Sequence, residues 1–342
     1  MDFSIAALLT QDGLTNGAIY CMLALALVLV FAVTRVIFIP QGEFVAFTVL
    51  TLAAFEQNKL PGTVWLLLAL GAAATLADAV SLRRAPRRML RAVAGNALPS
   101  LAAAGLVWVA FALQAGFALQ VLVTVIAVTA MGPAVYRLAY QPVATAPVLT
   151  LLIVSVAVHF VLTGLGLLFF GAEGARTSAF INATFVLGNI NVSGQSLLVY
   201  AFTVALVVGM ALFFKYTLFG KALRATAANR TGARLVGISP NFAGSLAMTL
   251  AAAIGAVSGL LIGSITTVYY DSGFLVGLKG FVGAIVGGLA SYPVAAAGAI
   301  FVGLVEAFSS FWASAYKEVI VFTLIIPVLL WRSFTTTHHE EE

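Results

Sequence analysis

Charged side chains are scarce in this sequence. Only 8% of the 342 residues are Asp, Glu, Lys or Arg, whereas 62% are hydrophobic. An ordinary soluble domain carries about 25% charged residues. A soluble fold of this length could not form a polar shell from so few charges, so the composition excludes a soluble enzyme and a disordered chain. It predicts an integral membrane protein with most of its mass in the bilayer.

Several catalytic and binding motifs are also missing. The single cysteine, Cys21, excludes an internal disulfide and a thiolate metal cluster. The sequence contains no phosphate-binding loop, no zinc-protease motif and no nucleophile elbow. It also has no basic and aromatic pattern typical of a nucleic-acid surface. We therefore predict a protein that is not an enzyme, with no cofactor, no metal site and no nucleic-acid partner. Any energy from ATP must come from another polypeptide.

Long apolar runs indicate the fold. A bilayer core of about 30 Å needs about 20 helical residues at 1.5 Å per residue. The runs are long, continuous and rich in Ala and Leu, without the two-residue alternation of a membrane β-barrel. They predict an all-α transmembrane bundle of about eleven spans: 16–34, 37–55, 63–82, 98–114, 117–136, 147–170, 197–214, 241–263, 274–290, 293–311 and 318–331. The glycine-rich stretch 264–290 could instead hold a broken or re-entrant helix.

Lysine and arginine in the loops indicate the orientation, because cytoplasmic loops carry the excess of these residues. With the N-terminus outside, thirteen basic residues fall inside and four fall outside. Those inside are Arg35, Arg83, Arg84, Arg87, Arg88, Arg91, Arg137, Lys215, Lys221, Arg224, Arg230, Arg234 and Arg332, and those outside are Lys59, Arg176, Lys279 and Lys317. The expected topology is N-out and C-in.

The connections divide the chain into one membrane domain, 1–334, and a polar tail, 335–342. Residues 171–196 form a polar external loop. Residues 215–240 form a basic internal segment, in which alanines favour a helix and Ser239-Pro240 opens the next span. A basic segment of this kind could also serve only to fix topology or to contact lipid headgroups.

Five ionisable residues interrupt the apolar runs, where they should face a partner, a cavity or an edge. Asp78 is expected to be an edge residue, paired or reaching to the interface near Arg83. His159 has no ligand partner at metal-binding spacing. Glu43 follows Pro40-Gln41-Gly42 and fits either an interrupted helix lining a cavity or an interfacial position. Glu306 needs a cation or a hydrogen bond, and Lys279 is one candidate.

Five strings resemble the permease subunits of branched-chain amino acid ABC importers, of the LivH type. They are Asn16-Gly17-Ala18-Ile19-Tyr20, the string from Ile39 to Phe44, the string from Tyr136 to Pro142, the basic segment from Gly220 to Ile238, and the region from Gly277-Leu278-Lys279 to Glu306-Ala307-Phe308-Ser309-Ser310. They occur in the family's order across about residues 13–331.

The resemblance implies a permease fold of the type II ABC importer kind and a translocation pathway for branched-chain or related amino acids. It implies two ATPase subunits, a second permease subunit that is a paralogue or a copy, a periplasmic or anchored solute-binding protein, and a bacterial inner membrane. The candidate pathway residues are Asn16, Tyr20, Gln41, Gly42, Glu43, His159, Lys279 and Glu306. The candidate ATPase-coupling helix, residues 221–237, is flanked by Gly220 and includes Lys221, Arg224, Asn229, Arg230, Arg234 and Gly237.

The sequence departs from the family pattern in three places. Residues 83–136 add a basic loop and two spans, Ala228-Asn229 replaces acidic residues in the coupling helix, and Pro40-Gln41 replaces Ala-His. Two other functions stay open. One is a stand-alone secondary transporter or channel that uses Glu43, Glu306 or His159, and the other is an ABC permease for urea or short amides.

Overall fold

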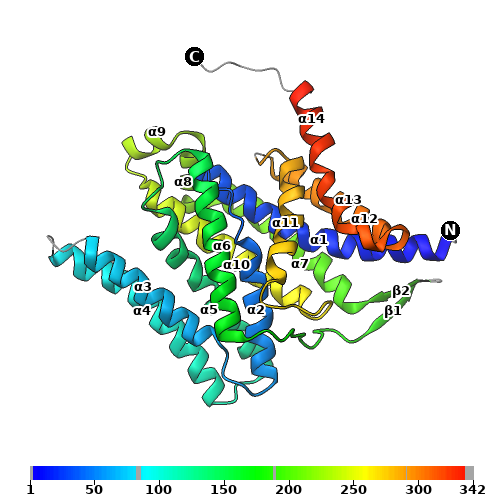
Figure 1. Ribbon diagram of the computed structural model, residues 1–342, viewed down its shortest axis with the longest axis horizontal. Coiled ribbons are helices and arrows are strands. Elements are labelled where there is room, and N and C mark those ends of the chain that lie inside the picture. The colour runs from blue at the N-terminus through cyan, green and yellow to red at the C-terminus, as the bar shows by residue number, and fades with distance from the viewer. Residues whose placement is uncertain (1–2, 82–85, 188–189, 290, 336–342) are drawn as a thin grey trace.

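The computed structural model describes residues 3–81, 86–187, 190–289 and 291–335, and nearly all of its regular structure is helical (Figure 1). The first six helices are α1 (Phe3–Thr34), α2 (Gln41–Glu56), α3 (Thr63–Ser81), α4 (Pro86–Ala112), α5 (Phe117–Val135) and α6 (Val148–Phe170), with a π-helical turn η1 (Tyr136–Tyr140) between α5 and α6. The remaining elements are β1 (Thr184–Leu187), β2 (Ile190–Ser193), α7 (Gly194–Tyr216), α8 (Leu218–Ala228), α9 (Arg230–Leu235), α10 (Pro240–Ile262), α11 (Ser272–Val286), α12 (Tyr292–Trp312), η2 (Ser314–Tyr316), α13 (Lys317–Thr323) and α14 (Ile325–Thr335).

Helix α1 forms the centre of the bundle. It packs against α12, α10, α11 and α7, and most of its apolar length is buried inside the protein. Helix α2 lies between α10, α11 and α5. Helices α3 and α4 form a hairpin that packs against α5 at the side of the bundle (Figure 1). The core is therefore the contact region of α1, α2, α10, α11 and α12, and most of the candidate pathway residues lie on these helices.

Seven helices within the described ranges are long and apolar enough to cross a membrane, judged by length and composition. They are α1, α3, α5 continued through η1, α6, α7, α10 and α12. Helices α6 and α7 expose most of their apolar side chains, and Phe160 and Leu168 on α6 are examples. Such surfaces are unfavourable in water and suit a lipid environment or another apolar partner. The structure therefore agrees with a helical membrane bundle, whereas it leaves the count of eleven spans and the orientation as predictions.

Three of the predicted spans are shorter or divided. Helix α2 has 16 residues and α11 has 15 residues, so α11 is about 22 Å long at 1.5 Å per residue, less than a bilayer core. The stretch 264–290 thus holds an irregular segment followed by a short helix. The predicted span 318–331 is divided between α13 and α14. Pro327 explains this break, because it cannot donate a hydrogen bond to Thr323 and its ring clashes with that carbonyl.

The basic segment between α7 and α10 was expected to form one helix over residues 221–237, and this expectation was wrong. Asn229 has an extended backbone and separates α8 from α9, where its side-chain oxygen accepts a hydrogen bond of 2.8 Å from the backbone N–H of Gly232. Gly237 then ends the segment with a φ of 88°, a value that favours glycine. Helix α10 begins at Pro240 with Ser239 as its cap, as predicted.

The polar segment 171–196 contains a β-hairpin in which β1 and β2 pair antiparallel. Its first part is held against the segment after α10 by the bridge between Ala175 and Val268. The N-terminal end of α1 and the hairpin lie at the right of Figure 1, and α8 and α9 lie at the upper left. We call these regions the hairpin end and the α9 end.

Candidate functional site

A large polar cavity opens beside α1 at the hairpin end. Its volume is about 820 Å³. Side chains of α1, the hairpin segment, α11, α12 and the start of α13 line it, together with the residues that follow α10. Four of the candidate pathway residues are among them: Asn16, Tyr20, Lys279 and Glu306. The sequence had distributed these residues over three predicted spans, and the fold brings them to one cavity.

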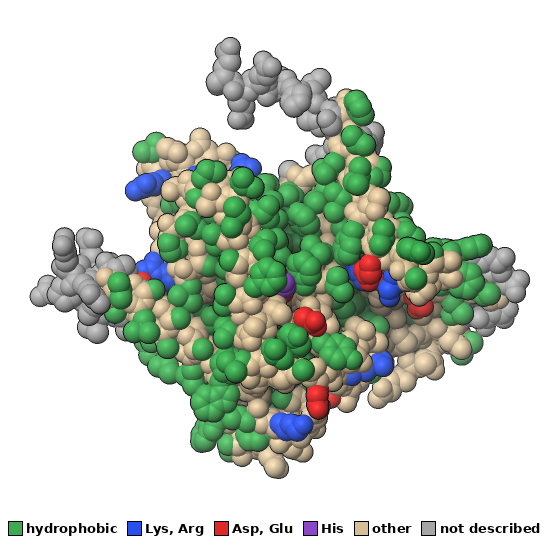
Figure 2. Space-filling view, in the orientation of Figure 1, with side chains coloured by type: hydrophobic (Ala, Val, Ile, Leu, Met, Phe, Trp, Pro, Cys, Tyr) green, Lys and Arg blue, Asp and Glu red, His purple; other side chains and the backbone are tan. Residues whose placement is uncertain are grey.

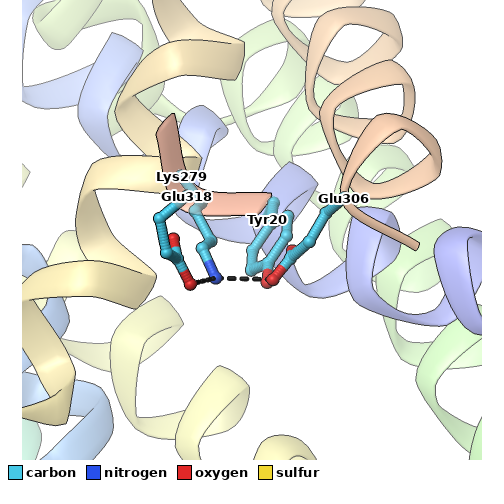
Figure 3. A network of polar contacts seen from close by, with 4 residues as sticks. All are labelled: Tyr20, Lys279, Glu306 and Glu318. Carbon is cyan, nitrogen blue, oxygen red and sulfur yellow. Dashed lines mark hydrogen bonds and ion pairs between the residues drawn. The ribbon is translucent and has the colours of Figure 1, made fainter. Parts of the chain in front are cut away.

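A network of four side chains, Tyr20, Lys279, Glu306 and Glu318, lies at this cavity (Figure 3), and the first three of them line it. The ammonium nitrogen of Lys279 lies 2.5 Å from Oε1 of Glu306 and 3.1 Å from Oε1 of Glu318. The hydroxyl of Tyr20 donates a hydrogen bond of 2.6 Å to Oε2 of Glu306. The structure therefore confirms that Lys279 and Glu306 meet. Charged groups are costly in an apolar interior unless they are paired and hydrogen-bonded, and this network supplies the partners.

Close backbone contacts place these side chains. A Cβ atom on Gly280 would lie 2.7 Å from the Cβ of Leu23, and a Cβ on Gly303 would lie 2.3 Å from the backbone nitrogen of Gly17. Small residues at these crossings let α11 and α12 approach α1 closely. The side chains of Lys279 and Glu306 can therefore reach each other, and Glu306 can reach Tyr20 on α1.

Further polar groups surround the network. The carboxylate of Asp12, the ammonium of Lys317 and the guanidinium of Arg176 also line the cavity. Arg176 is fixed by two hydrogen bonds, of 3.1 and 2.8 Å, to the carbonyl oxygen of Ser264. Sequence analysis missed Glu318, which lies in the predicted last span, as well as Asp12 and Arg176. A cavity that presents both signs of charge beside hydroxyl and amide groups can hold a small molecule that carries an ammonium and a carboxylate.

A second cluster lies away from this cavity. Glu43, in the first turn of α2, is fully buried, and its Oε1 lies 2.6 Å from Nδ1 of His159 on α6. The ring of His159 stacks on Phe274 of α11 at 4.5 Å. His159 therefore packs against Glu43 and Phe274 and does not line the polar cavity. Glu43 is buried in protein at the start of α2. The pair links α2, α6 and α11.

Gln41 and Gly42 belong to the same region and do not line the polar cavity. The amide of Gln41 donates a hydrogen bond of 2.9 Å to the carbonyl of Ala251 on α10. A Cβ on Gly42 would lie 1.7 Å from the carbonyl oxygen of Gly273, so α2 and α11 cross in backbone contact. The eight candidate pathway residues therefore divide into four at the cavity and four in this second region.

Asp78, expected at an edge, is buried on α3 and forms an ion pair with Arg137 of η1. The Nε of Arg137 lies 2.9 Å from Oδ1 of Asp78. Arg83, the partner considered from the sequence, lies outside the described residues. Asp78 takes no part in the cavity network.

Helices α8 and α9 bind the bundle through one face and expose the other. Leu223 packs in a cluster with Leu29 and Val33 at the end of α1 and with Ala243 and Ala247 at the start of α10. The segment is therefore joined to two central helices through its apolar side.

The exposed face of α8 and α9 carries both charge and apolar surface. Lys221, Arg224 and Arg234 are exposed, and Arg230 is half-buried. Basic side chains gather at this end of the molecule in Figure 2. Leu235 and Val236 are also exposed, by 83% and 75%. A mixed basic and apolar surface of this kind suits a protein partner better than water alone.

Residues 89–329, from α4 to α14, match the family model described as the permease component of branched-chain amino acid transport systems. The match covers more than half of the chain.

Similar curated proteins carry names of the same kind. A high-affinity branched-chain amino acid transport system permease protein, BraD of Pseudomonas aeruginosa, is 31% identical over 247 residues, which are 70% of this chain and 79% of BraD. The permease protein LivH of Escherichia coli K12 is 30% identical over 213 residues, 60% of this chain and 69% of LivH. LivH of Salmonella typhimurium has the same identity and coverage. No solved structure matches the chain.

Proposed function

Because the chain belongs to the family of branched-chain amino acid transport permeases, we propose that it forms the translocation pathway of an ABC importer for branched-chain or related amino acids. Its energy comes from separate ATPase subunits, and a solute-binding protein delivers the solute. The finer assembly that we propose has two ATPases and a second permease subunit in a bacterial inner membrane. The chain crosses that membrane up to eleven times, with the N-terminus outside and the C-terminus inside.

The observation that carries this proposal is the charged wall of the polar cavity. Every amino acid has an α-carboxylate and an α-ammonium a few ångströms apart, and the wall offers Lys279 next to Glu306 and Glu318. A zwitterion can exchange its two charges with such a network without leaving a bare charge in the membrane. Urea and short amides carry no charged groups to match, so the network favours amino acids over that alternative.

The proposed orientation assigns opposite roles to the two ends. The hairpin end, where the cavity opens, faces the solute-binding protein, and the α9 end faces the ATPases. Several basic side chains, among them Arg230 and Arg234 of α9, lie at the α9 end, in agreement with the excess of positive charge in cytoplasmic loops. Movement of an ATPase would reach α1 and α10 through the packing of Leu223.

The test is reconstitution of this chain with its ATPases and binding protein in liposomes. We expect uptake of leucine that depends on ATP. Reversing charge on the exposed face of α8 and α9, with Arg224→Glu and Arg234→Glu together, should remove ATPase binding and reduce uptake at least tenfold, because the partner surface must complement these charges. Lys59→Glu, an exposed change in the loop between α2 and α3, is the matched control and should leave ATPase binding intact.

Liposomes that contain only this chain separate the remaining alternative. A secondary transporter or channel would move leucine down an imposed ion or solute gradient without ATPases, and Glu43, His159 and Glu306 would be its ion sites. Gradient-driven flux in these liposomes would refute the proposal. If the charge-reversed variant still bound the ATPases, only the coupling role of residues 215–240 would be refuted, and the rest of the proposal would stand.

A further inference from the structure

A short segment after α5 contacts both the α9 end and the membrane helices. It consists of the π-helical turn η1 (Tyr136–Tyr140) and the turn residues 141–147, and we call it the η1 joint. π-helical turns are rare in proteins, and those that occur often lie at functional sites. None of the functions assigned above uses this segment.

Each polar or aromatic side chain of η1 contacts a different helix. The end of the Tyr136 side chain lies over Gly244 of α10, where an added Cβ would come within 2.3 Å of its hydroxyl oxygen. Arg137 pairs with the buried Asp78 of α3. The hydroxyl of Tyr140 lies 3.1 Å from Oγ of Ser155 on α6. Three membrane helices are thus attached to five consecutive residues.

The other part of the joint contacts the basic segment. Arg230 of α9 donates a hydrogen bond of 3.0 Å from Nη1 to the carbonyl oxygen of Ala144. Ala144 and Thr145 form one wall of a groove of about 540 Å³, and Arg230, Arg234 and the start of α10 form the rest. A displacement of α9 therefore moves residues 141–147, which continue directly into α6.

We propose that the η1 joint is a second mechanical connection between the ATPase-coupling segment and the pathway, and that the Asp78–Arg137 pair positions it. The first connection runs from α8 to α1 and α10, through Leu223. The second runs from Arg230 through the joint to α6 and, through Arg137, to the α3–α4 hairpin. In this arrangement the helices α3 and α4 act as a fixed support, and α6 moves relative to them. The inference rests on the proposed function of residues 215–240 as the ATPase-coupling segment.

The electrostatics explain why this pair is suited to hold a joint. Asp78 is only 1% exposed and pairs with Arg137, whereas the side chain of Arg137 is partly exposed. A buried charge that loses its partner is costly. The pair therefore fixes the orientation of η1 relative to α3 while the turn residues remain free to follow α9.

The experiment measures the number of ATP molecules hydrolysed per leucine taken up by the reconstituted importer. Asp78→Asn keeps the shape of the side chain and removes its charge, and its Arg137 partner is partly exposed and can be hydrated. We expect the variant to bind the ATPases and hydrolyse ATP, with the ratio of ATP to leucine raised about tenfold, a typical size for coupling between sites. Glu56→Gln, an acid-to-amide change at an exposed acceptor of Ser178, is the matched control and should leave the ratio unchanged.

A purely structural role would give a different result. If Asp78→Asn only reduced the amount of folded importer, ATP hydrolysis and uptake would fall together and their ratio would stay constant, which would overturn the proposal. The double variant Asp78→Asn with Arg137→Gln removes both charges and keeps the site neutral. We expect it to regain normal levels in the membrane and to keep the raised ratio, whereas a normal ratio would also overturn the proposal. ATPase binding by the charge-reversed α8 and α9 variant is measured separately. If that variant still binds the ATPases, the proposed coupling role of residues 215–240 is wrong, and this outcome is distinct from a failure of the η1 joint.

Discussion

Two clusters of ionisable side chains in the bundle, the cavity network and the Glu43–His159 pair, share one helix. Helix α11 contributes Lys279 to the cavity network and Phe274 to the cluster of Glu43 and His159. Both clusters place a carboxylate against a nitrogen base at a similar distance, 2.5 Å for Lys279 and Glu306 and 2.6 Å for His159 and Glu43. They differ in their surroundings.

The cavity network is open to a polar space. Lys279 and Glu306 line a cavity of about 820 Å³, and Lys279 has a second carboxylate, Glu318, within reach. The groups can therefore exchange partners with a solute or with water at little cost. The Glu43 cluster has no such freedom, because Glu43 is fully enclosed and the imidazole is stacked on an aromatic ring.

The difference teaches that an ionisable residue in an apolar span does not by itself mark a transport pathway. A pair that faces a polar cavity can take part in binding, whereas an enclosed pair acts mainly as a link between helices. On this argument the Lys279 network carries uptake, and the Glu43–His159 pair carries stability. Variants in the two clusters should therefore change different quantities.

The largest effect on uptake is expected from Lys279→Met. The change removes the cation between Glu306 and Glu318 and leaves a poorly exposed carboxylate without its partner, a loss of about 3–5 kcal/mol. Uptake per assembled importer should fall by at least a hundredfold. Lys59→Met, in which the exposed lysine lies outside the cavity lining, is the control.

The assay is leucine uptake in liposomes, normalised to the amount of complex. The double variant Lys279→Met with Glu306→Gln removes both charges, so it should restore the amount of complex and leave uptake low. Normal uptake in this double variant would show that the pair is structural and would remove the distinction between the clusters.

A smaller effect is expected from Tyr20→Phe. It removes one hydrogen bond to a charged acceptor, Oε2 of Glu306, and bonds of this kind contribute about 1.5–3 kcal/mol. Uptake per importer should fall at least tenfold, because a tenfold change corresponds to about 1.36 kcal/mol, just below the low end of that range. The measurement is the initial rate at low leucine concentration.

Tyr200→Phe provides the matched control, since the Tyr200 hydroxyl lies 2.9 Å from the neutral hydroxyl of Thr15 and 3.1 Å from the carbonyl oxygen of Gln11. Its effect should be smaller, from about twofold to about tenfold, because neutral hydrogen bonds contribute about 0.5–1.5 kcal/mol. Equal effects of the two variants on uptake would contradict the prediction that the hydrogen bond to the charged Glu306 contributes more than the neutral hydrogen bonds of Tyr200.

Much of the fold follows from the sequence because long apolar runs dictate helices. The predicted spans 63–82, 117–136, 147–170, 241–263 and 293–311 agree closely with α3, α5, α6, α10 and α12. The sequence could not show the division at Asn229, because alanine favours a helix on both sides and only the capping bond to Gly232 reveals the break. The division at Leu324 had a signal, Pro327, that the apolar pattern obscured.

The sequence predicted several residues of the candidate site, but it did not predict how these residues contact one another in space. Lys279 and Glu306 stood out because charges are rare in apolar runs, but their meeting depends on the approach of α11 and α12 to α1. Glu318 was overlooked because it stands at the edge of a span, where a charge is unremarkable. Helix crossings such as that of Gly42 with Gly273 decide which residues share a cavity, and one sequence does not encode them in a local pattern.

The smallest effect on uptake is expected from His159→Gln. Glutamine can still donate a hydrogen bond toward Glu43. It loses the ring stacking on Phe274 and the short contact of 2.6 Å between Nδ1 of His159 and Oε1 of Glu43. Aromatic pairs contribute about 0.5–1.5 kcal/mol beyond the burial of their area, so thermal unfolding of the purified complex should occur a few degrees lower. Uptake per assembled importer should change less than twofold, because no group at the polar cavity moves.

Glu43→Gln with His159→Gln replaces the pair by two amides that can bond to each other, and it tests the same argument from the other partner. Since a neutral pair avoids an enclosed charge, this double variant should recover part of the thermal stability that His159→Gln loses and should keep nearly normal uptake. A large fall in uptake, with stability restored, would show that the enclosed pair takes part in transport after all, and enclosure would then fail as the criterion that separates the two clusters.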